Sequence, residues 1–384
     1  MSFLNFASFI CFILFQIIIR MLPIFRDVAY QEEIRRLNQT LRRKRRRIRM
    51  ELNLEELSET RFKELFRINK ALFRFLCEEL TPYLRQPKYL SGVTVQQKVL
   101  VALRFYATGS YQRSVGGDFN LGVSQTSVHR YVHEVTNAIN DNLTARTIKF
   151  PTTRREMNIV KENFMQKFQF PGVVGAIDCT QIAILKPNNE EHNYINRKGY
   201  HSLNVQLICD SDLKILSINA NYPGSTHDSF IWRNSEVKNF LLTQYRQGLR
   251  RTWLLGDSGY PLEPVLMTPY QNPLEGSSES HYNQNHIRAR NCIERTNGVL
   301  KARFRCLLKE RVARYAPEFV GKLVNTCCVL HNLCITFGIE HEENDNEEEN
   351  DILQNIGNQN IMGNLGAREG EAIRRSIVNT YFNI

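Results

Sequence analysis

Four acidic residues stand in contexts that are unusual for surface carboxylates. Asp178 lies inside the apolar stretch VVGAIDCTQIAI, Asp257 follows the apolar run of WLLGDSGY, and Asp228 lies in YPGSTHDS. Glu294 belongs to the polar segment RARNCIERTNGVLKARFRC. An unpaired carboxylate in a buried strand is costly. Asp178 must therefore be paired, lie at an exposed strand end or bind a metal.

Together these acids predict a divalent-metal site. Mg²⁺ and Mn²⁺ prefer carboxylate oxygens, and phosphoryl transfer commonly uses two such ions about 3.5–4 Å apart. We therefore expect Asp178, Asp228, Asp257 and Glu294 to ligate Mg²⁺ or Mn²⁺. The alternative stays open, because a lone aspartate after a strand is more often a turn former or a helix cap. Asp228, which opens a predicted helix, fits that alternative best.

Basic residues accompany Glu294 on the same predicted helix. Arg290, Asn297 and Lys301 are spaced so that they share its face. An acid among such groups fits a metal ligand beside phosphate-binding side chains. The alternative is an ordinary surface pair between Arg290 and Glu294, which would contribute well under ~1 kcal/mol.

Two further basic segments are candidates for nucleic-acid binding. Arg197 and Lys198 lie in the turn NRKGYHS, which either contacts phosphate or forms an ordinary hairpin. The run IRRLNQTLRRKRRRIRM (34–50) carries nine Lys and Arg and no acid. Such a run favours a nuclear-localisation signal or a nucleic-acid-binding arm over a solvated basic helix.

The elements that must position these residues fall into two regions. Residues 51–150 read as helical, with a helix over 93–110 and a helix-turn-helix pattern over 115–139. Ser124 is the expected N-cap of the second helix, whose exposed face carries Arg130 as a candidate DNA contact. A plain helical hairpin is the alternative. Residues 171–337 read as three strands, a helix, a further strand and then helices, which predicts a mixed α/β domain.

Composition sets the outer limits of the interpretation. The chain has 384 residues and a net charge of +11, which is compatible with a polyanionic partner. Nine irregularly spaced cysteines predict reduced thiols rather than a disulfide framework. The segment 1–50 consists of an apolar leader followed by the basic arm. The leader reads as a membrane anchor, a core helix or a misassigned first exon. We expect no membrane partner. The acidic segment 338–384 is expected to be disordered, and its last residues, EAIRRSIVNTYFNI, are candidates for a short terminal helix.

At the level of whole motifs, the chain resembles the PIF/Harbinger transposases, and especially the Harbinger transposase-derived nucleases of animals. The resemblance is carried, in order, by GVVGAIDCTQIAI, NYINRKGYHSLNVQLICD, NYPGSTHDS, WLLGDSGYPL, MTPY, CIERTNGVLKARFRCL and CCVLHNLC. It implies an RNase H-like DDE nuclease core with the catalytic triad Asp178, Asp257 and Glu294, and Asp228 as a further metal-linked acid. It also implies DNA as substrate, a Myb-like DNA-binding partner, and a nuclear or also cytoplasmic location; a homo-oligomer is a further expectation.

Three functions compete at this point. The first is a metal-dependent DNA endonuclease, and the second is a domesticated transposase that binds DNA or protein without catalysis. The third is a serine hydrolase, because GDSGYP around Ser258 echoes a protease motif. The mixed α/β order conflicts with the double β-barrel of such proteases. The intact acids favour the first function.

Overall fold

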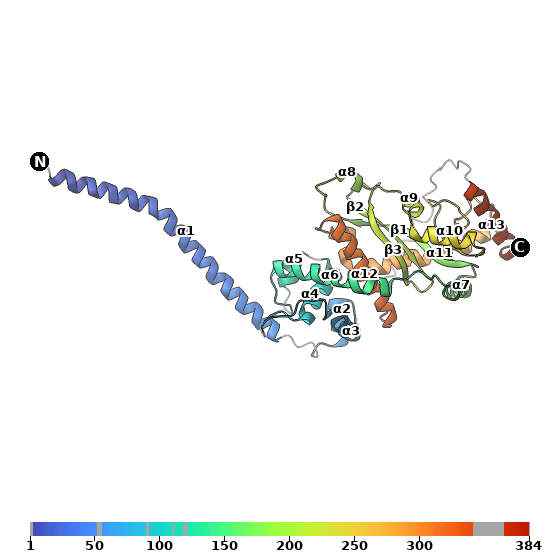
Figure 1. Cartoon of the computed structure of the whole chain (residues 1–384), viewed down its shortest axis with the longest axis horizontal. Coiled ribbons are helices and arrows are strands. Elements are labelled where there is room, and N and C mark those ends of the chain that lie inside the picture. The colour runs from blue at the N-terminus through green and yellow to red at the C-terminus, as the bar shows by residue number, and fades with distance from the viewer. Residues whose placement is uncertain are drawn as a thin grey trace.

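A computed structural model describes residues 3–51, 56–89, 92–109, 111–117, 121–340 and 365–383, with side chains described from residue 26 onward. The chain begins with the long helix α1 (Phe3–Glu51), whose described part extends away from the remaining elements (Figure 1). The basic arm is therefore helical. Near its end, Arg49 Nη1 donates to the Gly122 carbonyl at 2.7 Å and fixes the helix to the turn before α6. The side chains of the apolar leader lie outside the described residues.

Five helices follow in the region expected to be helical. Their starts and ends follow local rules: Thr94 and Gln97 form a capping box at α4, Gly109 ends that helix at φ 59°, and the Ser124 side chain accepts from the Ser127 amide at α6. The helix predicted over 93–110 is present as α4, shorter by two residues at each end, and the predicted cap of α6 is confirmed. The five helices are α2 (Glu59–Phe66), α3 (Lys70–Leu80), α4 (Val95–Thr108), α5 (Gln112–Gly117) and α6 (Gln125–Thr147).

The second region is built on a five-stranded mixed sheet in the order β3-β2-β1-β4-β5. β1 pairs antiparallel with β2, and β2 with β3, whereas β1, β4 and β5 are parallel. The predicted mixed α/β class is confirmed. The strands are β1 (Val173–Ala183), β2 (Ser202–Cys209), β3 (Ile215–Pro223), β4 (Trp253–Leu255) and β5 (Leu266–Met267).

Helices cover both faces of this sheet, so the apolar run of β1 is buried on both sides. Ala176 belongs to the large core cluster beneath α11 (Ser278–Arg303) and α12 (Pro317–Thr336), whereas its neighbour Ile177 belongs to a second cluster. The second cluster packs against α7 (Arg154–Phe168), α9 (Asp228–Arg233) and α10 (Glu236–Arg246). The remaining short helices are α8 (Glu191–Tyr194) and the 3-10 turns η1 (Arg305–Leu307) and η2 (Lys309–Arg311).

Among the helices whose side chains are described, from residue 26 onward, α12 alone is long and apolar enough to cross a membrane. Most of it is buried inside the protein, and its side chains belong to the core. We therefore describe it as a core helix.

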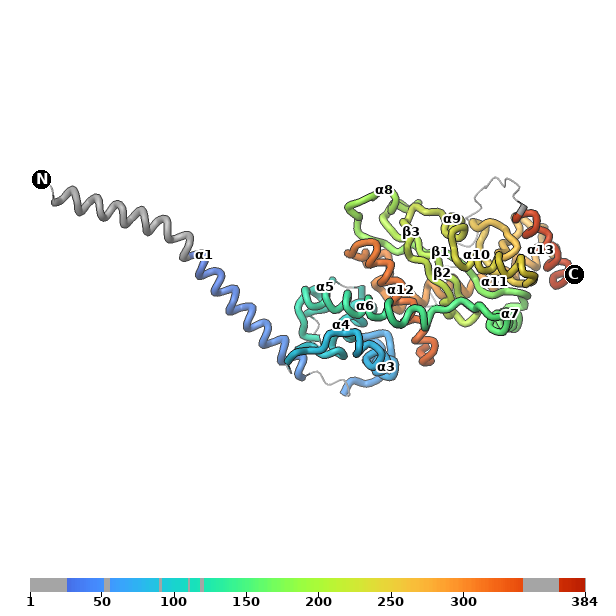
Figure 2. The backbone as a smooth tube through the Cα atoms, viewed as in Figure 1, coloured from blue at the N-terminus to red at the C-terminus, as the bar shows by residue number. Residues whose placement is uncertain are grey.

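The C-terminal helix α13 (Leu365–Tyr381) corrects part of the expectation for the tail. The terminal helix proposed for the last residues is present, but it begins earlier, and instead of being disordered this part of the tail packs beside α11 and β5 and buries Ile377, Val378 and Phe382. Figures 1 and 2 show it at the far end of the molecule from α1. These apolar side chains supply the burial that the acidic run lacks. The acidic run itself, at 341–364, lies outside the described residues.

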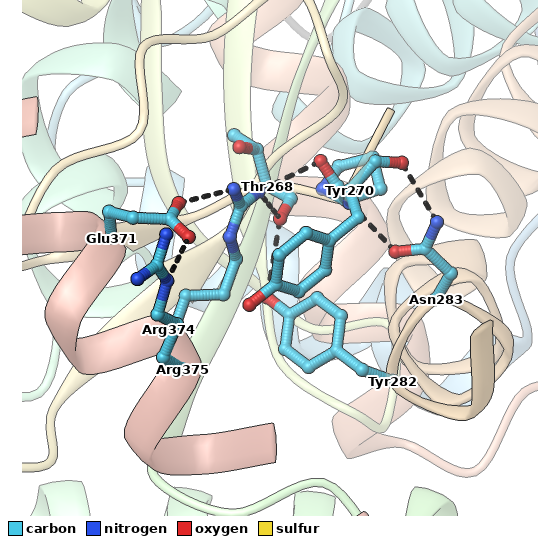
Figure 3. A network of polar contacts seen from close by, with 8 residues as sticks. Thr268, Tyr270, Tyr282, Asn283, Glu371, Arg374 and Arg375 are labelled. Carbon is cyan, nitrogen blue, oxygen red and sulfur yellow. Dashed lines mark hydrogen bonds and ion pairs between the residues drawn. The ribbon is translucent and has the colours of Figure 1, made fainter. Parts of the chain in front are cut away.

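A polar network centred on Arg374 attaches α13 to the segment that follows β5 (Figure 3). Arg374 donates to the carbonyls of Thr268 and Pro269 at 3.1 and 3.0 Å, and its guanidinium lies 3.8 Å from the centroid of the Tyr270 ring. Glu371, one turn earlier, accepts from Arg374 at 2.5 Å. The helix is thereby bound to the segment that follows β5.

Candidate metal and nucleic-acid site

The register of the two central strands brings the first two predicted acids together. In the parallel pairing of β1 with β4, Ala176 is aligned with Leu255, and pairing ends there. Asp178 and Asp257 each lie two residues beyond this last pair. Both acids therefore lie just past the end of the β1–β4 pairing, on neighbouring segments. Asp178 is not at the end of its strand: β1 continues to Ala183, because β2 pairs with it from Ala176 to Ala183.

Asp228 reaches the same edge from the start of α9. His227, not Asp228, is the N-cap of this helix, since its Nδ1 accepts from the Ser229 amide at 3.3 Å. The alternative of Asp228 as a simple helix cap is therefore wrong. Its Oδ1 accepts instead from Asn204 Nδ2 at 2.7 Å, and the same amide group donates to the Thr226 carbonyl at 2.8 Å.

Helix α11 carries the fourth acid. Asn297, one turn after Glu294, donates to Asp178 Oδ2 at 3.3 Å, which places this helix face against β1. Glu294 itself is paired with Arg290. Arg290 is no ordinary surface residue, because its side chain is only 15% exposed and it also attracts Asp178 and Asp257. The predicted Arg290–Glu294 pair exists, but it belongs to the acidic cluster.

The pKa shifts of the acids show that the carboxylates repel one another. The pKa of Asp178 is raised to about 7, chiefly by burial; Arg290 acts to lower it, and Asp257 and Asp228 contribute to the rise. Burial likewise raises the pKa of Asp257, against the lowering effect of Arg290, with Asp228 and Glu294 adding to the rise. Desolvation and like charge both disfavour ionisation. Accumulated negative charge of this kind is what a cation would neutralise.

The donor set fits a hard divalent cation, although the acids are not gathered around one point. Among the described residues, no three His, Cys, Asp or Glu side chains lie close enough to form a ready metal site. Glu294 is turned to Arg290. All four acids offer oxygen, the ligand atom of Mg²⁺ and Mn²⁺. In addition, the buried side-chain oxygens of Asn204 and Asn297 have no hydrogen-bond partner in the structure.

The other predicted basic residues lie outside this cluster. Lys301 Nζ donates to the Gln181 carbonyl at 3.4 Å, further along β1. Arg197 and Lys198 are exposed in a tight turn in which the Asn196 amide donates to the Tyr200 carbonyl at 3.0 Å. This turn precedes β2 and lies beyond the end of β1 rather than beside the acids.

Arg130 lies elsewhere again, on α6. It is exposed, donates to the Tyr131 hydroxyl at 2.9 Å and lies 3.6 Å from Glu134. The structure does not bring it near the carboxylates, and a DNA contact there stays a prediction.

The residue that sequence reasoning missed is Asn204. β2 alternates Ser202, Asn204 and Gln206 with apolar residues, and all three are buried. A polar residue at every second position of a buried strand is a signal for a polar layer, because buried polar groups need partners. The sequence therefore indicates a buried polar layer on β2, but it does not show that the partner of Asn204 is Asp228.

Known proteins share sequence similarity with this chain. A model of the DDE superfamily endonuclease domain matches residues 177–332. The chain is 34% identical over 290 residues to the protein named "Putative nuclease HARBI1" of Homo sapiens, covering 75% of this chain and 81% of that protein. It is 35% identical to the Xenopus laevis protein of the same name, covering 69% and 75%. It is 25% identical to "Protein ALP1-like" of Arabidopsis thaliana, covering 71% and 70%. No solved structure matches significantly.

Proposed function

Because the chain belongs to the Harbinger transposase-derived nucleases among the DDE superfamily endonucleases, we propose that it is a divalent-metal-dependent DNA endonuclease that hydrolyses phosphodiester bonds. One observation carries the proposal: the parallel register of β1 and β4 sets Asp178 beside Asp257 where their pairing ends. The strand order, with antiparallel β1 to β3 and parallel β4 and β5, supports an RNase H-like core.

We assign the residues as follows. Asp178, Asp257 and Glu294 hold the cations, and Asp228, oriented by Asn204, completes the set. Such cations lower the pKa of a bound water and neutralise charge at the scissile phosphate. Arg290 offsets the negative charge of the acids, and with Glu294 holding a cation it would be available to contact the phosphate. Lys301 and the turn with Arg197 and Lys198 are proposed to contact the DNA backbone.

Regions outside the sheet have supporting roles in the proposal. The basic helix over 34–50 and the predicted helix-turn-helix with Arg130 contribute further DNA contacts, together with a Myb-like partner protein. The basic run also directs the protein to the nucleus, with the cytoplasm as a second location. Catalysis between two protomers is compatible with the expected homo-oligomer.

A second function is favoured by one observation. Glu294 is paired with Arg290, and the acids do not form a ready metal site among the described residues. A domesticated transposase that binds DNA or protein without catalysis would tolerate that arrangement. The two functions differ in whether the carboxylates are needed for strand cleavage.

The deciding experiment is the nicking of a supercoiled plasmid by the full-length protein. We expect nicking with Mg²⁺ or Mn²⁺ and none with EDTA, and we expect Asp178→Ala and Glu294→Ala each to reduce it by more than about a hundredfold, because ligand loss exceeds the effect of losing an outer-shell partner. Glu279→Ala is the matched control, since Glu279 is an exposed acid in the first turn of the same helix. Folded wild-type protein that binds DNA without nicking it would favour the second function.

A further inference from the structure

A cleft of about 700 Å³ lies where the α5–α6 helix pair faces the segment between α11 and α12. Arg113 from α5, and Arg311 and Arg314 from that segment, line the cleft, and Glu310 is the single acid among its lining residues. All three arginines are exposed. The cleft therefore presents concentrated positive charge to solvent, which favours an anionic ligand.

Aromatic rings stand beside these charges. The Arg314 guanidinium lies 4.8 Å from the centroid of the Tyr111 ring, and Tyr111 is 64% exposed. His129 from α6 stacks on Tyr315 with centroids 5.8 Å apart, and Gln112 donates to the Tyr315 hydroxyl at 2.8 Å. Exposed rings interleaved with arginines are typical of surfaces that bind nucleic acid, because bases stack on the rings and phosphates meet the cations.

The cleft is joined to the catalytic strand by main-chain hydrogen bonds. The Ala313 amide, in the cleft wall, donates to the Ala183 carbonyl at 3.1 Å, and the Leu185 amide donates to the Ala313 carbonyl at 2.9 Å. Ala183 lies five residues beyond Asp178 on β1, about 17 Å at the rise of a strand. That distance corresponds to about five nucleotides along a DNA strand.

Further positive groups lie along β1 and beyond its end. Lys301 contacts the Gln181 carbonyl, between the acids and the point where the cleft joins β1. Lys309 Nζ lies 4.7 Å from the centroid of the Tyr200 ring, which ends the basic turn with Arg197 and Lys198 beyond the end of β1.

We propose that this cleft binds the sugar–phosphate backbone of the DNA beside the cleaved bond, about five nucleotides from the carboxylates. The inference rests on the proposed nuclease function and adds to it the position and direction of the bound strand. Duplex DNA and a single strand share this backbone, so the experiment tests both.

The experiment measures DNA binding by the full-length Asp178→Ala protein, which binds without cutting. The probes are a fluorescently labelled duplex and its labelled single strand, titrated at several NaCl concentrations. We expect the double variant Arg113→Ala and Arg311→Ala to make the slope of log K against log [NaCl] shallower by about 1.8 for the duplex or about 1.4 for the single strand. The probe with the larger fractional loss of affinity identifies the form bound.

Controls separate a local contact from a loss of total charge. Arg154→Ala with Arg155→Ala removes the same charge from the exposed start of α7, which Figure 1 shows far from α5, and should leave the slope unchanged. Arg113→Lys with Arg311→Lys should keep most of the slope, since a phosphate contact needs charge more than shape. An unchanged slope in the alanine pair, or an equal reduction in the α7 pair, would overturn the proposal.

The outcome is distinguishable from a failure of the proposed function. Metal-dependent nicking by the wild-type protein together with an unchanged slope refutes the cleft and keeps the nuclease. A reduced slope in a protein that never nicks DNA keeps the cleft as a DNA site and refutes the nuclease.

Discussion

At the scale of single residues, Asp178 is the most informative side chain. It lies between two apolar runs, is hydrogen-bonded by Asn297, and has neighbouring acids that disfavour its ionisation. Its environment is unfavourable to a carboxylate unless a cation is present. That is the reason to regard it as a ligand rather than as a structural residue.

This environment predicts a pH dependence of stability in the metal-free protein. The pKa of Asp178 is raised from 3.8 to about 7 on folding. A raised pKa means that the folded state binds the proton more tightly, so the stabilisation is full below pH 3.8 and is lost as the pH rises toward 7. In EDTA, the melting temperature of the wild-type protein should therefore fall relative to Asp178→Asn over this range. Mg²⁺ should reverse the fall, and parallel melting curves for the two proteins would contradict the prediction.

At the scale of elements, the pairing of β1 with β4 decides the site. Gly175 lies in β1 just before the aligned residues Ala176 and Leu255. A Cβ atom there would lie 2.8 Å from Ile208 Cγ2 and 3.1 Å from Leu254 Cδ2. The glycine therefore allows the close approach of β1 to its neighbours on both sides.

Gly175→Ala should lower the free energy of unfolding by about 1–3 kcal/mol, because overpacking a buried sheet forces its neighbours apart. Urea denaturation measures the effect. The control is Gly366→Ala in α13, where a Cβ atom would meet nothing within 4 Å. That substitution should change stability by less than about 1 kcal/mol, toward greater stability, because alanine is the better helix former. Equal effects of the two substitutions would show that the close packing around Gly175 has no energetic weight.

At the scale of the whole molecule, the two ends of the chain are attached in different ways. The basic end of α1 contacts the turn before α6 through Arg49. α13 instead returns across the sheet edge and is fixed by Arg374 to the carbonyls of Thr268 and Pro269 (Figure 3). The sheet edge beyond β4, the strand that precedes Asp257, is thereby covered.

Arg374→Ala should lower the free energy of unfolding by about 1.5–3 kcal/mol, because it removes the charged hydrogen bonds to both carbonyls and leaves the Pro269 carbonyl without this donor, whereas the Thr268 carbonyl keeps the Tyr282 hydroxyl. Arg375→Ala is a close control, since Arg375 also contacts Glu371, at 3.0 Å, but its side chain is 72% exposed. Arg375→Ala should lower the free energy of unfolding by less than about 0.5 kcal/mol. Chemical denaturation of the two variants compares them directly, and similar losses would mean that α13 is not held through Arg374.

The sequence by itself determined the local features. The helix over 95–108, the cap at Ser124, the mixed α/β order and the four acids all follow from spacing, capping and turn chemistry, which act over a few residues. It did not reveal that β1 continues past Asp178, that Asn204 orients Asp228, or that α13 packs on the sheet. Those facts depend on strand register and on burial between segments far apart in the chain. Only the tertiary structure decided which of the acids meet, because one parallel register sets Asp178 beside Asp257 and a one-residue shift would separate their side chains onto opposite faces.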